Sequence, residues 1–348
     1  MLQISLIMTL LNERDSLGDL LESIDLQTRP PDEVVICDAG STDGTLEAIE
    51  GWRASTTIPT KVVVAEGVNI AQGRNIAIRN AAYDILAGTD GGCVLDEDWL
   101  RLIAEPLEDP SIDLVFGGSV AYGESMMGRT FANLFNAKTH TGNFTNTEHS
   151  SRSVAFRRGA WEAVGGYPEY LSLAAEDSTF FGALEHDHPS LVVRDAFVTW
   201  RHGTDRLTTI YRVHRRNARG EGEVLMWPSR FAELAAGYVL ATFLIARPRS
   251  TWRARSFGAL LLLVYGSRAS RRVVRDSGDR LMYVTLPLLS LVRDTGMLVG
   301  YAQGLMSRRT AAPARSGVHG PGAGSPEVVT ASPPVNATGG PPDPDSSL

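Results

Sequence analysis

Short apolar runs alternate with helix-like segments over the first third of the chain. Apolar runs of strand length occupy Ile4–Leu10, Glu33–Cys37, Lys61–Ala65 and Tyr83–Ala87. The segments after them carry apolar residues at helical spacing, with helices expected over Asp15–Gln27, from Thr42, over Asn75–Ala82 and over Trp99–Glu105. This alternation predicts an α/β fold in which helices cover both faces of a mostly parallel, doubly wound sheet.

The pattern changes near residue 205. Leu207–Gly220 is predicted to be an arginine-rich helix, and three apolar segments follow at Phe231–Ala246, Ser256–Tyr265 and Leu281–Leu305. The first two are shorter than the roughly 20 residues that a membrane-spanning helix needs. The third carries Arg293-Asp294, a charged pair that is costly in lipid unless its members are paired. We therefore expect helices that lie in the membrane interface, and spanning stays an open alternative.

Composition divides the chain further. From Thr310 onward Pro, Gly, Ser and Ala dominate, which predicts disorder. The expected parts are an α/β domain over 1–205, a helical membrane-associated region over 206–309 and a disordered tail over 310–348.

Charge is spread unevenly along the chain. The net charge is −7, yet residues 201–316 hold 20 Arg and no Lys against 7 acidic residues. Such a basic segment indicates an anionic partner, and the neighbouring apolar stretches favour a membrane surface. Aromatic residues are too sparse there to favour a nucleic acid. A soluble domain with arginine-rich helix faces is the plainer alternative.

The cysteines and the N-terminus bear on the compartment. Cys37 and Cys93 are the only cysteines, which allows no disulfide framework and no cysteine metal motif. No basic stretch precedes the apolar run Leu2–Leu11, and Asn12-Glu13-Arg14 follows it at once, which is unlike a signal peptide. These features predict a cytoplasmic protein.

Polar residues follow the predicted strands, at the edge where such sheets bind ligands. Asn12, Asp38 and Asp90 all stand there. Asp38 can accept hydrogen bonds from a nucleoside, although a simple helix cap and turn would need the same residues. Asp90, beside two glycines, can hold a hard cation that offsets the charge of a diphosphate leaving group, although a surface turn is the alternative.

Two later features carry candidate chemistry. Glu176-Asp177 precedes an apolar helical segment, so these acids either complement the helix dipole or supply a general base. His202 follows the strand-like run Ala196–Trp200 and is either a metal ligand or an ordinary surface histidine.

In this order, the segments together resemble family 2 glycosyltransferases with the GT-A fold. The resemblance covers about residues 3–205 and includes Ser5–Ser41, Gly67–Ala81, Thr89-Asp90, and a block running from Ser153 through Tyr167-Pro168 to Glu176-Asp177. The later part is similar to the membrane-associated tails of succinoglycan-type exopolysaccharide transferases.

The resemblance implies an inverting sugar transfer from a nucleotide-activated donor. Asp177, with Glu176 beside it, would activate an acceptor hydroxyl that attacks the anomeric carbon opposite the departing nucleoside diphosphate. The donor-binding residues it implies are Asn12, Glu13, Asp38, Arg74 and Asp90. Asp90 and His202, which lies 25 positions after Asp177, would hold Mg²⁺ or Mn²⁺.

Two positions depart from the family pattern. Ala39 replaces the second aspartate after Asp38 and removes one possible nucleoside contact. Gly92 replaces the second aspartate of the metal-binding DxD motif, which weakens the metal site. Fixed positive charge for the leaving group would otherwise come from Arg215, Arg216 and Arg219, for which lipid headgroup binding is an equal alternative.

Other function classes fit less well. No G-x-G-x-x-G follows the first strand, as a Rossmann dehydrogenase would need, and no P-loop motif is present. A sugar nucleotidyltransferase would need a basic, glycine-rich loop where Asn12-Glu13 stand. A catalytically impaired, glycosyltransferase-like membrane scaffold is the alternative that Gly92 supports, and the intact Glu176-Asp177 argues against it. The preferred interpretation is an enzyme of exopolysaccharide or cell-envelope glycan synthesis on the cytoplasmic side of the membrane, with a lipid-linked or glycan acceptor.

Overall fold

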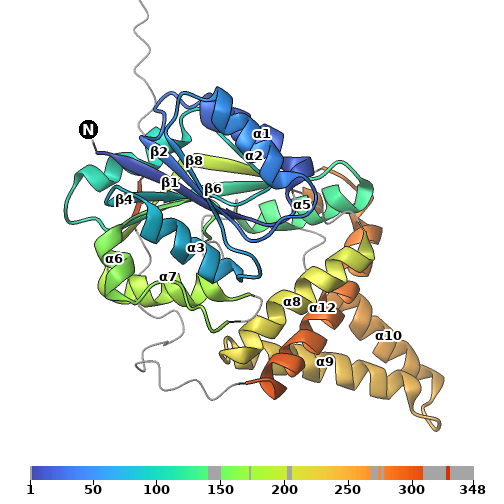
Figure 1. Cartoon of the computed structure of the whole chain (residues 1–348). Helices are drawn as coiled ribbons and strands as arrows, with labels where there is room; N and C mark the ends of the chain where they lie inside the picture. The colour runs from blue at the N-terminus through green and yellow to red at the C-terminus, as the bar shows by residue number, and fades with distance from the viewer. Residues whose placement is uncertain are drawn as a thin grey trace, which may run out of the picture.

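The computed structural model of the chain describes residues 2–139, 150–171, 174–201, 206–267, 273–275, 278–308 and the strand at 327–329. These residues form an α/β domain and a group of helices beside it (Figure 1). Of the tail predicted to be disordered, only Glu327–Val329 are described, and they pair with a strand of the sheet.

One nine-stranded sheet forms the α/β domain, in the order β3-β2-β1-β4-β7-β6-β8-β5, with β9 beside β8. The first four strands of this order pair in parallel, as the alternating pattern predicts. The strand bounds are β1 Ile4–Leu10, β2 Glu33–Asp38, β3 Thr60–Val64, β4 Ile85–Gly88, β5 Cys93–Leu95, β6 Leu114–Tyr122, β7 Val154–Arg157, β8 Ser190–Arg201 and β9 Glu327–Val329.

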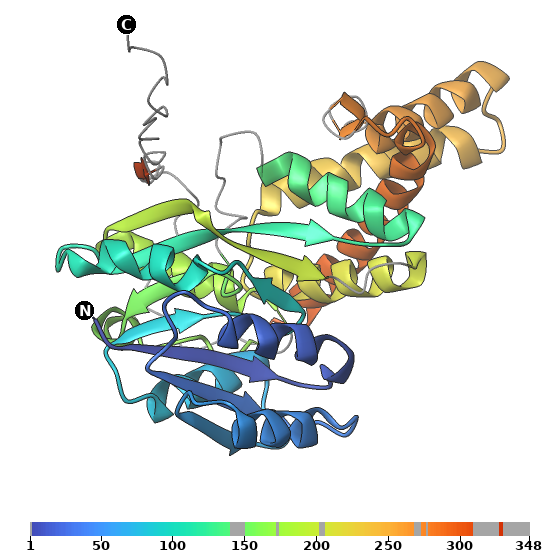
Figure 2. The same cartoon turned by 90° about the horizontal axis from the view of Figure 1, so that it is seen from above.

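The second half of the sheet is mixed. β7 lies between β4 and β6 and runs antiparallel to both, and β5 runs antiparallel to β8. β6 pairs with β8, and β8 with β9, in parallel, so the sheet is mostly parallel as predicted and the antiparallel pairings are confined to β7 and β5. Figure 2 shows both halves as one continuous twisted layer.

Helices cover both faces of the sheet, as expected. One apolar core joins β1 and β4 to α1, α2 and α4, and a second joins the other sheet face to α3, α6 and α7. The helix bounds are α1 Arg14–Asp25, α2 Thr45–Ser55, α3 Ile70–Asn80, α4 Trp99–Ala104, α5 Met126–Thr139, α6 Arg158–Ala163 and α7 Glu176–Asp187, with a short 3₁₀ turn at Glu105–Glu108.

α3 begins five residues before its predicted start at Asn75. Asn69 caps the helix by accepting from the backbone N–H of Gln72, and the Gln72 side chain accepts from the backbone N–H of Asn69. This reciprocal capping satisfies two backbone donors that a helix start leaves free. The extra turns bring Arg74 into the helix interior.

The C-terminal region is helical, with α8 Leu207–Glu223, α9 Pro228–Ala246, α10 Trp252–Gly266 and α12 Met282–Met306. α8 and α12 lie side by side, whereas α9 and α10 form a hairpin that projects away from the sheet (Figure 1). A small apolar core that includes Phe131, Ile210 and Leu286 ties α5 to α8 and α12. This core anchors the helical region on the α/β domain.

Two of these helices are long and apolar enough to cross a membrane, judged by length and composition alone: α9 and α12. The prediction that the α9 segment is too short is wrong, because the helix gains Pro228 to Arg230 at its start and reaches 19 residues. α12 is partly buried against its neighbours.

Glycines set the contact between α8 and α12. A Cβ on Gly300 would lie 2.0 Å from the carbonyl oxygen of Arg215, and one on Gly304 would lie 2.1 Å from that of Arg219. Gly296 is similarly close to the carbonyl oxygen of Tyr211, at 2.7 Å. Only glycine at these three positions, each four residues apart, lets the two backbones approach so closely.

The charged pair in the middle of α12 is satisfied. Arg293 Nη2 lies 2.7 Å from the Asp294 carboxylate, and Tyr238 Oη of α9 donates to the same carboxylate at 2.9 Å. The side chain of Asp294 is buried, so these partners offset much of its desolvation cost.

Candidate active site

The candidate active site lies at the edge of the sheet where β1, β2 and β4 end. β7 runs antiparallel to β4, with Gly88 opposite Val154, so the residues that precede Val154 meet those that follow Gly88. The first turn of α7 reaches the same edge. The segments around Asp90, Ser151 and Glu176-Asp177 are thereby brought together.

Arg74 connects the acidic residues of this site. Its Nη1 lies 2.9 Å from Glu176 Oε1 and 2.5 Å from Asp177 Oδ1, and its Nη2 lies 2.8 Å from Asp90 Oδ1. The Arg74 side chain is 4% exposed, so these ion pairs are largely shielded from water. One guanidinium thus orients three carboxylates that are far apart in the sequence.

Asp177 has further partners on the β7 side. Ser151 donates to it twice, from its backbone N–H at 3.1 Å and from its hydroxyl at 2.8 Å. The Ser151 hydroxyl also lies 2.8 Å from the phenolic oxygen of Tyr167, which is fully buried. These contacts fix the direction of the Asp177 carboxylate.

An aromatic cluster positions α7. Phe180 stacks on Tyr167 with ring centroids 4.0 Å apart, and Phe181 meets Phe116 of β6 edge-to-face at 5.0 Å. Ala175, with φ of +72°, turns the chain into the helix. Burial of these rings therefore holds the first turn, with its two acids, against Arg74.

Burial and neighbouring charge shift the protonation of the site. Burial raises the pKa of the Glu176 carboxyl and the adjacent Asp177 charge raises it further, while Arg74 opposes both. Burial alone would lower the pKa of Arg74, but Asp177, Asp90 and Glu176 together hold it well above its ordinary value. Arg74 therefore stays charged, and Glu176 takes a proton more readily than a free glutamate.

Asn75, the next residue of α3, fixes the segment that leads toward α7. Its Oδ1 accepts from Trp161 Nε1 at 3.0 Å and from the backbone N–H of Tyr167 at 2.9 Å. Its Nδ2 donates to the Tyr167 carbonyl at 2.9 Å and to Glu169 Oε1 at 2.8 Å. The side-chain amide is thus fully used.

Glu13 lies over the Asp90 turn. A Cβ on Gly91 would fall 2.7 Å from Glu13 Cδ, so glycine at 91 allows the carboxylate to sit there. Burial raises the pKa of Glu13, the hydrogen bond from Ser16 opposes this rise, and the charges of Asp90 and Asp43 add to it. Glu13 therefore belongs to the same group of acids.

Asp38 and Asn12 organise the neighbouring loop. Asp38 is fully buried and accepts from the backbone N–H groups of Gly40 and Ser41 and from the Ser41 hydroxyl. Asn12, at φ of +57°, accepts from the backbone N–H of Thr42 at 2.9 Å. In this structure both side chains act on the loop itself, and their contact with a nucleoside stays a prediction.

Of the two expected metal ligands, the structure describes only Asp90. Among the described residues no group of three or more His, Cys, Asp or Glu side chains could hold a metal ion. His202 lies outside the described residues. Gly92 has φ of +73° and its carbonyl accepts from the backbone N–H of Arg201 at 2.8 Å, a conformation that favours glycine over the usual aspartate.

The arginines of α8 take part in other contacts. Arg215 Nε donates to Gln303 at 2.9 Å, and Arg219 lies 3.4 Å from Glu223. Arg216 is exposed. No contact within the described part of the chain joins these three to Asp90, Glu176 or Asp177, so their role toward a diphosphate stays a prediction.

Sequence reasoning missed Arg152. Its Nε lies 4.0 Å from Asp90 Oδ2, and its guanidinium lies 4.2 Å above the ring of Trp200. Its place before the buried strand β7 would have indicated the site only if the antiparallel pairing of β7 with β4 were known.

Comparison with known proteins bears on the family that the α/β domain resembles. Residues 5–162 match the model of Glycosyl transferase family 2. The glycosyltransferase AglE of Haloferax volcanii is 28% identical over 180 residues, which cover 48% of this chain and 57% of that protein. YfnE of Bacillus subtilis, an uncharacterized glycosyltransferase, is 36% identical over 96 residues, covering 27% of this chain and 24% of its own. The chain thus spans less than two thirds of either relative.

A solved structure extends the likeness to the fold. A mannosyltransferase from Pyrobaculum calidifontis, determined in complex with GDP-mannose and Mn²⁺, superposes with a TM-score of 0.57 at 19% identity and covers 88% of both chains. Residues 5–162 match the family model and the sheet is built as above, so the α/β domain has the GT-A fold and is similar to family 2 glycosyltransferases over that span.

Proposed function

We propose that this protein transfers a sugar from a nucleotide-sugar donor to an acceptor hydroxyl, with inversion at the anomeric carbon. The observation that carries the proposal is the convergence of Asp90, Glu176 and Asp177 on the buried Arg74. One carboxylate is enough for a structural ion pair with an arginine. When three carboxylates share one guanidinium, some of their oxygens are left to accept a proton or to face a ligand.

Asp177 is the proposed general base. Its side chain is 20% exposed, so an acceptor hydroxyl can reach it, and Ser151 and Arg74 hold it in one direction. The base takes the hydroxyl proton as the oxygen attacks the anomeric carbon, while the bond to the nucleoside diphosphate breaks. Glu176 supports it, and burial favours the protonated form of that second acid.

The donor would lie along the ends of β1, β2 and β4. Asn12, Glu13 and Asp38 face the nucleoside in this proposal, and Arg74 with Asp90 faces the diphosphate. Arg152 adds positive charge beside Asp90, where charge accumulates as the sugar bond breaks.

A divalent metal fits this site only together with the donor. Asp90 is the proposed protein ligand, and no group of three or more potential ligands occurs among the described residues, whereas Mg²⁺ or Mn²⁺ commonly takes one or two carboxylates plus substrate phosphates. His202 is a further proposed ligand. When bound, the ion would offset the charge of the leaving diphosphate.

The acceptor and the place of the reaction follow from the helical region. Two apolar helices suggest membrane association. The cytoplasmic side is the proposed location, because nucleotide sugars would be available there as donors. A lipid-linked or growing glycan acceptor, in exopolysaccharide or cell-envelope synthesis, is consistent with that position. A catalytically impaired scaffold is the competing proposal, with Gly92 in its favour.

Donor turnover by Asp177→Asn separates the two proposals. We expect donor hydrolysis and transfer to fall on the order of 100- to 10,000-fold, the range for loss of a general base. Asp187→Asn, at the exposed end of the same helix, is the matched control and should retain wild-type turnover.

Thermal-shift measurements with UDP- and GDP-sugars, with and without Mn²⁺, identify the donor. If Asp177→Asn turns over as fast as wild type, Asp177 is not the base. If the wild-type protein neither binds nor hydrolyses any donor, the result supports the proposal of a catalytically impaired scaffold.

A further inference from the structure

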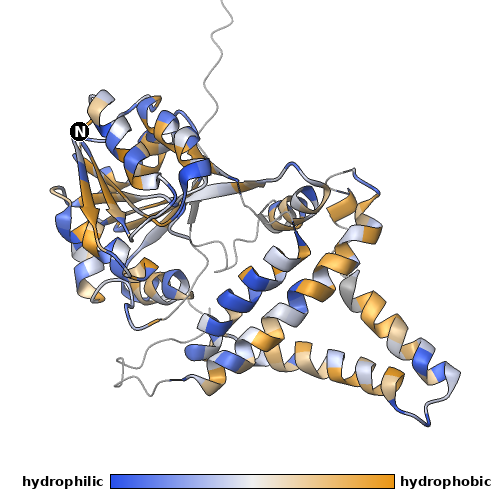
Figure 3. Cartoon of the chain, turned by 45° about the vertical axis from the view of Figure 1, so that its right-hand side comes forward, coloured by the Kyte–Doolittle hydropathy of each residue, from blue (hydrophilic) through white to orange (hydrophobic). Residues whose placement is uncertain are grey.

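The hairpin of α9 and α10 exposes a large apolar surface. Val239 and Phe243 of α9 are 68% and 54% exposed, and Phe257, Leu260 and Val264 of α10 are 52–53% exposed. Figure 3 shows both helices coloured as hydrophobic beside the hydrophilic α8. Water-soluble surfaces rarely carry apolar patches of this extent.

α10 is apolar along most of its length and yet barely covered. Among the α10 residues described from Ser256 onward, only Gly258 is buried, and it lies where the helix crosses α9 at Ala241. A helix that is hydrophobic on all sides belongs either in a protein core or in lipid. The described residues provide no core around it.

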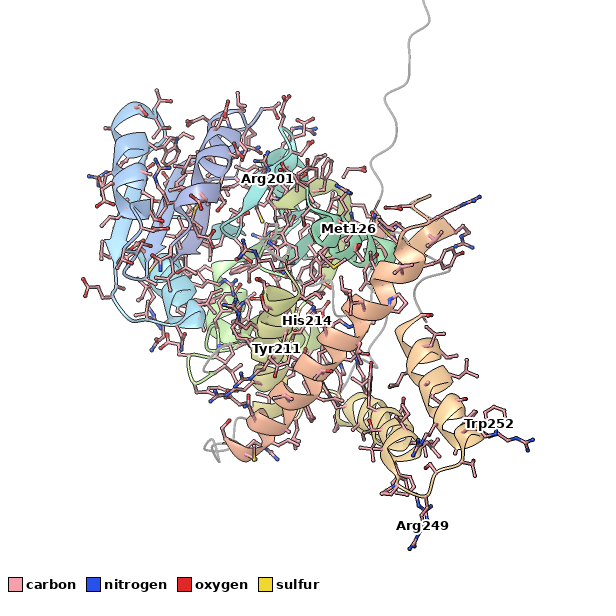
Figure 4. The ribbon with its side chains drawn as sticks, turned by 90° about the vertical axis from the view of Figure 1, so that its right-hand side faces the viewer. Met126, Arg201, Tyr211, His214, Arg249 and Trp252 are labelled. Carbon is pink, nitrogen blue, oxygen red and sulfur yellow. The ribbon has the colours of Figure 1, made fainter. Side chains whose placement is uncertain are left out.

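The tip of the hairpin is strongly basic. Arg247, Arg249, Arg253 and Arg255 lie around it, and no acidic residue occurs between Glu233 and Asp276. Trp252 is 73% exposed, and Figure 4 shows it with Arg249 at the outermost end of the molecule. Arginine and tryptophan at the border of an apolar surface match the headgroup region of an anionic membrane.

The geometry also bears on whether the hairpin crosses the bilayer. α10 has 15 residues, about 22 Å of helix, against a hydrocarbon core of roughly 30 Å. Crossing would carry four arginines to the far side, against the tendency of basic residues to stay on the cytoplasmic side. α12 is held along α8, whose exposed Arg212, Arg215 and Arg216 would have to enter lipid with it.

We propose that the α9–α10 hairpin is a monotopic anchor that inserts into one leaflet of an anionic membrane, with its arginine-rich tip at the headgroups of that same leaflet. This inference deepens the membrane association included in the proposed function. It does not depend on sugar transfer.

Vesicle flotation of the full-length protein tests the lipid partner. We expect binding to phosphatidylglycerol-rich vesicles and weaker binding to pure phosphatidylcholine vesicles. Arg249→Glu with Arg253→Glu should lower partitioning to the anionic vesicles by at least roughly 25-fold, about fivefold for each arginine. Phe257→Ser with Leu260→Ser should lower binding to both vesicle types.

Matched controls keep the test specific. Arg53→Glu with Arg101→Glu changes two exposed arginines of the α/β domain and should leave flotation unchanged. Full-length protein that stays in the supernatant, or that forms a dimer through the hairpin instead, overturns the proposal. Donor turnover measured on the same samples keeps a failure of catalysis distinct from a failure of binding.

Thiol labelling tests the topology. The two native cysteines are both fully buried, so Ser250→Cys at the tip and Ser55→Cys on α2 each create a single accessible thiol. In bacterial spheroplasts a membrane-impermeant maleimide should label neither, and after lysis it should label both. Labelling of the tip alone in intact spheroplasts would show that the hairpin spans the membrane.

Discussion

Removal of the Arg74 guanidinium tests whether the three acids of the site depend on it. Arg74→Met keeps much of the side-chain volume and leaves Asp90, Glu176 and Asp177 without their shared cation. Loss of one partner from a buried ion pair costs about 3–5 kcal/mol. For a domain of this size, that corresponds to a fall in Tm of roughly 6–20 °C.

The loss should depend on pH in a definite direction. Burial already raises the pKa of Glu176 above its ordinary value of 4.5, and Arg74 opposes that rise. The folded form binds this proton more tightly than the unfolded chain, so stability falls as pH rises above about 4.5. Without Arg74 the pKa rises further, and the variant should therefore lose more stability at pH 8 than at pH 5.

Urea and thermal unfolding at both pH values, without donor, measure this effect. Adding Glu176→Gln to Arg74→Met should restore part of the stability, because it removes one of the unpaired charges. Arg79→Met, which breaks the exposed pair with Glu169, should cost less than about 1 kcal/mol at either pH. A cost for Arg74→Met that matches this control, or that is the same at both pH values, would refute the reasoning.

Three further predictions concern glycines and the metal. Gly300→Ala places a Cβ 2.0 Å from a carbonyl oxygen of α8 and should cost about 1–3 kcal/mol or more in unfolding free energy. The control Gly51→Ala, in open space on α2, should be neutral or stabilising by up to about 1 kcal/mol. Equal effects of the two substitutions in urea titrations would contradict the close contact between α8 and α12. Gly91→Ala displaces Glu13 and should weaken donor binding in calorimetry without changing Tm, and Gly159→Ala should change neither. Mn²⁺ alone should leave Tm unchanged and should raise it when UDP or GDP is also present; a shift with Mn²⁺ alone would show a protein-only metal site that includes residues outside the described set.

The parallel half of the fold could be predicted because its signal is local. β1, β2 and α1 appear in the sequence within one or two residues of their bounds, since strand length and helical spacing are both visible there. The direction of β7 was not predictable, because a strand of only four residues, Val154–Arg157, carries no information about which strands it pairs with. The strand directions in the mixed half of the sheet are therefore known only from the structure.

The site was predictable to a similar degree. Asp90 and Glu176-Asp177 were predicted as site residues from a family resemblance that depends on their order along the chain. In the structure all three form ion pairs with the guanidinium of Arg74. Ser151 and Arg152 escaped notice because their role depends on the antiparallel pairing. The glycines at 296, 300 and 304 were readable as a spacing of four, but their partner, the backbone of α8, was not.

The adjacency of Arg74 and Asn75 in α3 has a mechanical consequence. Arg74 holds Asp90, the proposed donor-side acid, and Asp177, the proposed base, and Asn75 holds Tyr167 and the segment that leads to α7. One turn of α3 therefore contacts both the Asp90–Asp177 side and the Tyr167 side of the site. In the proposed mechanism, a displacement of α3 when a donor enters also moves the acceptor side, so substitutions in this turn should change the KM values of donor and acceptor together.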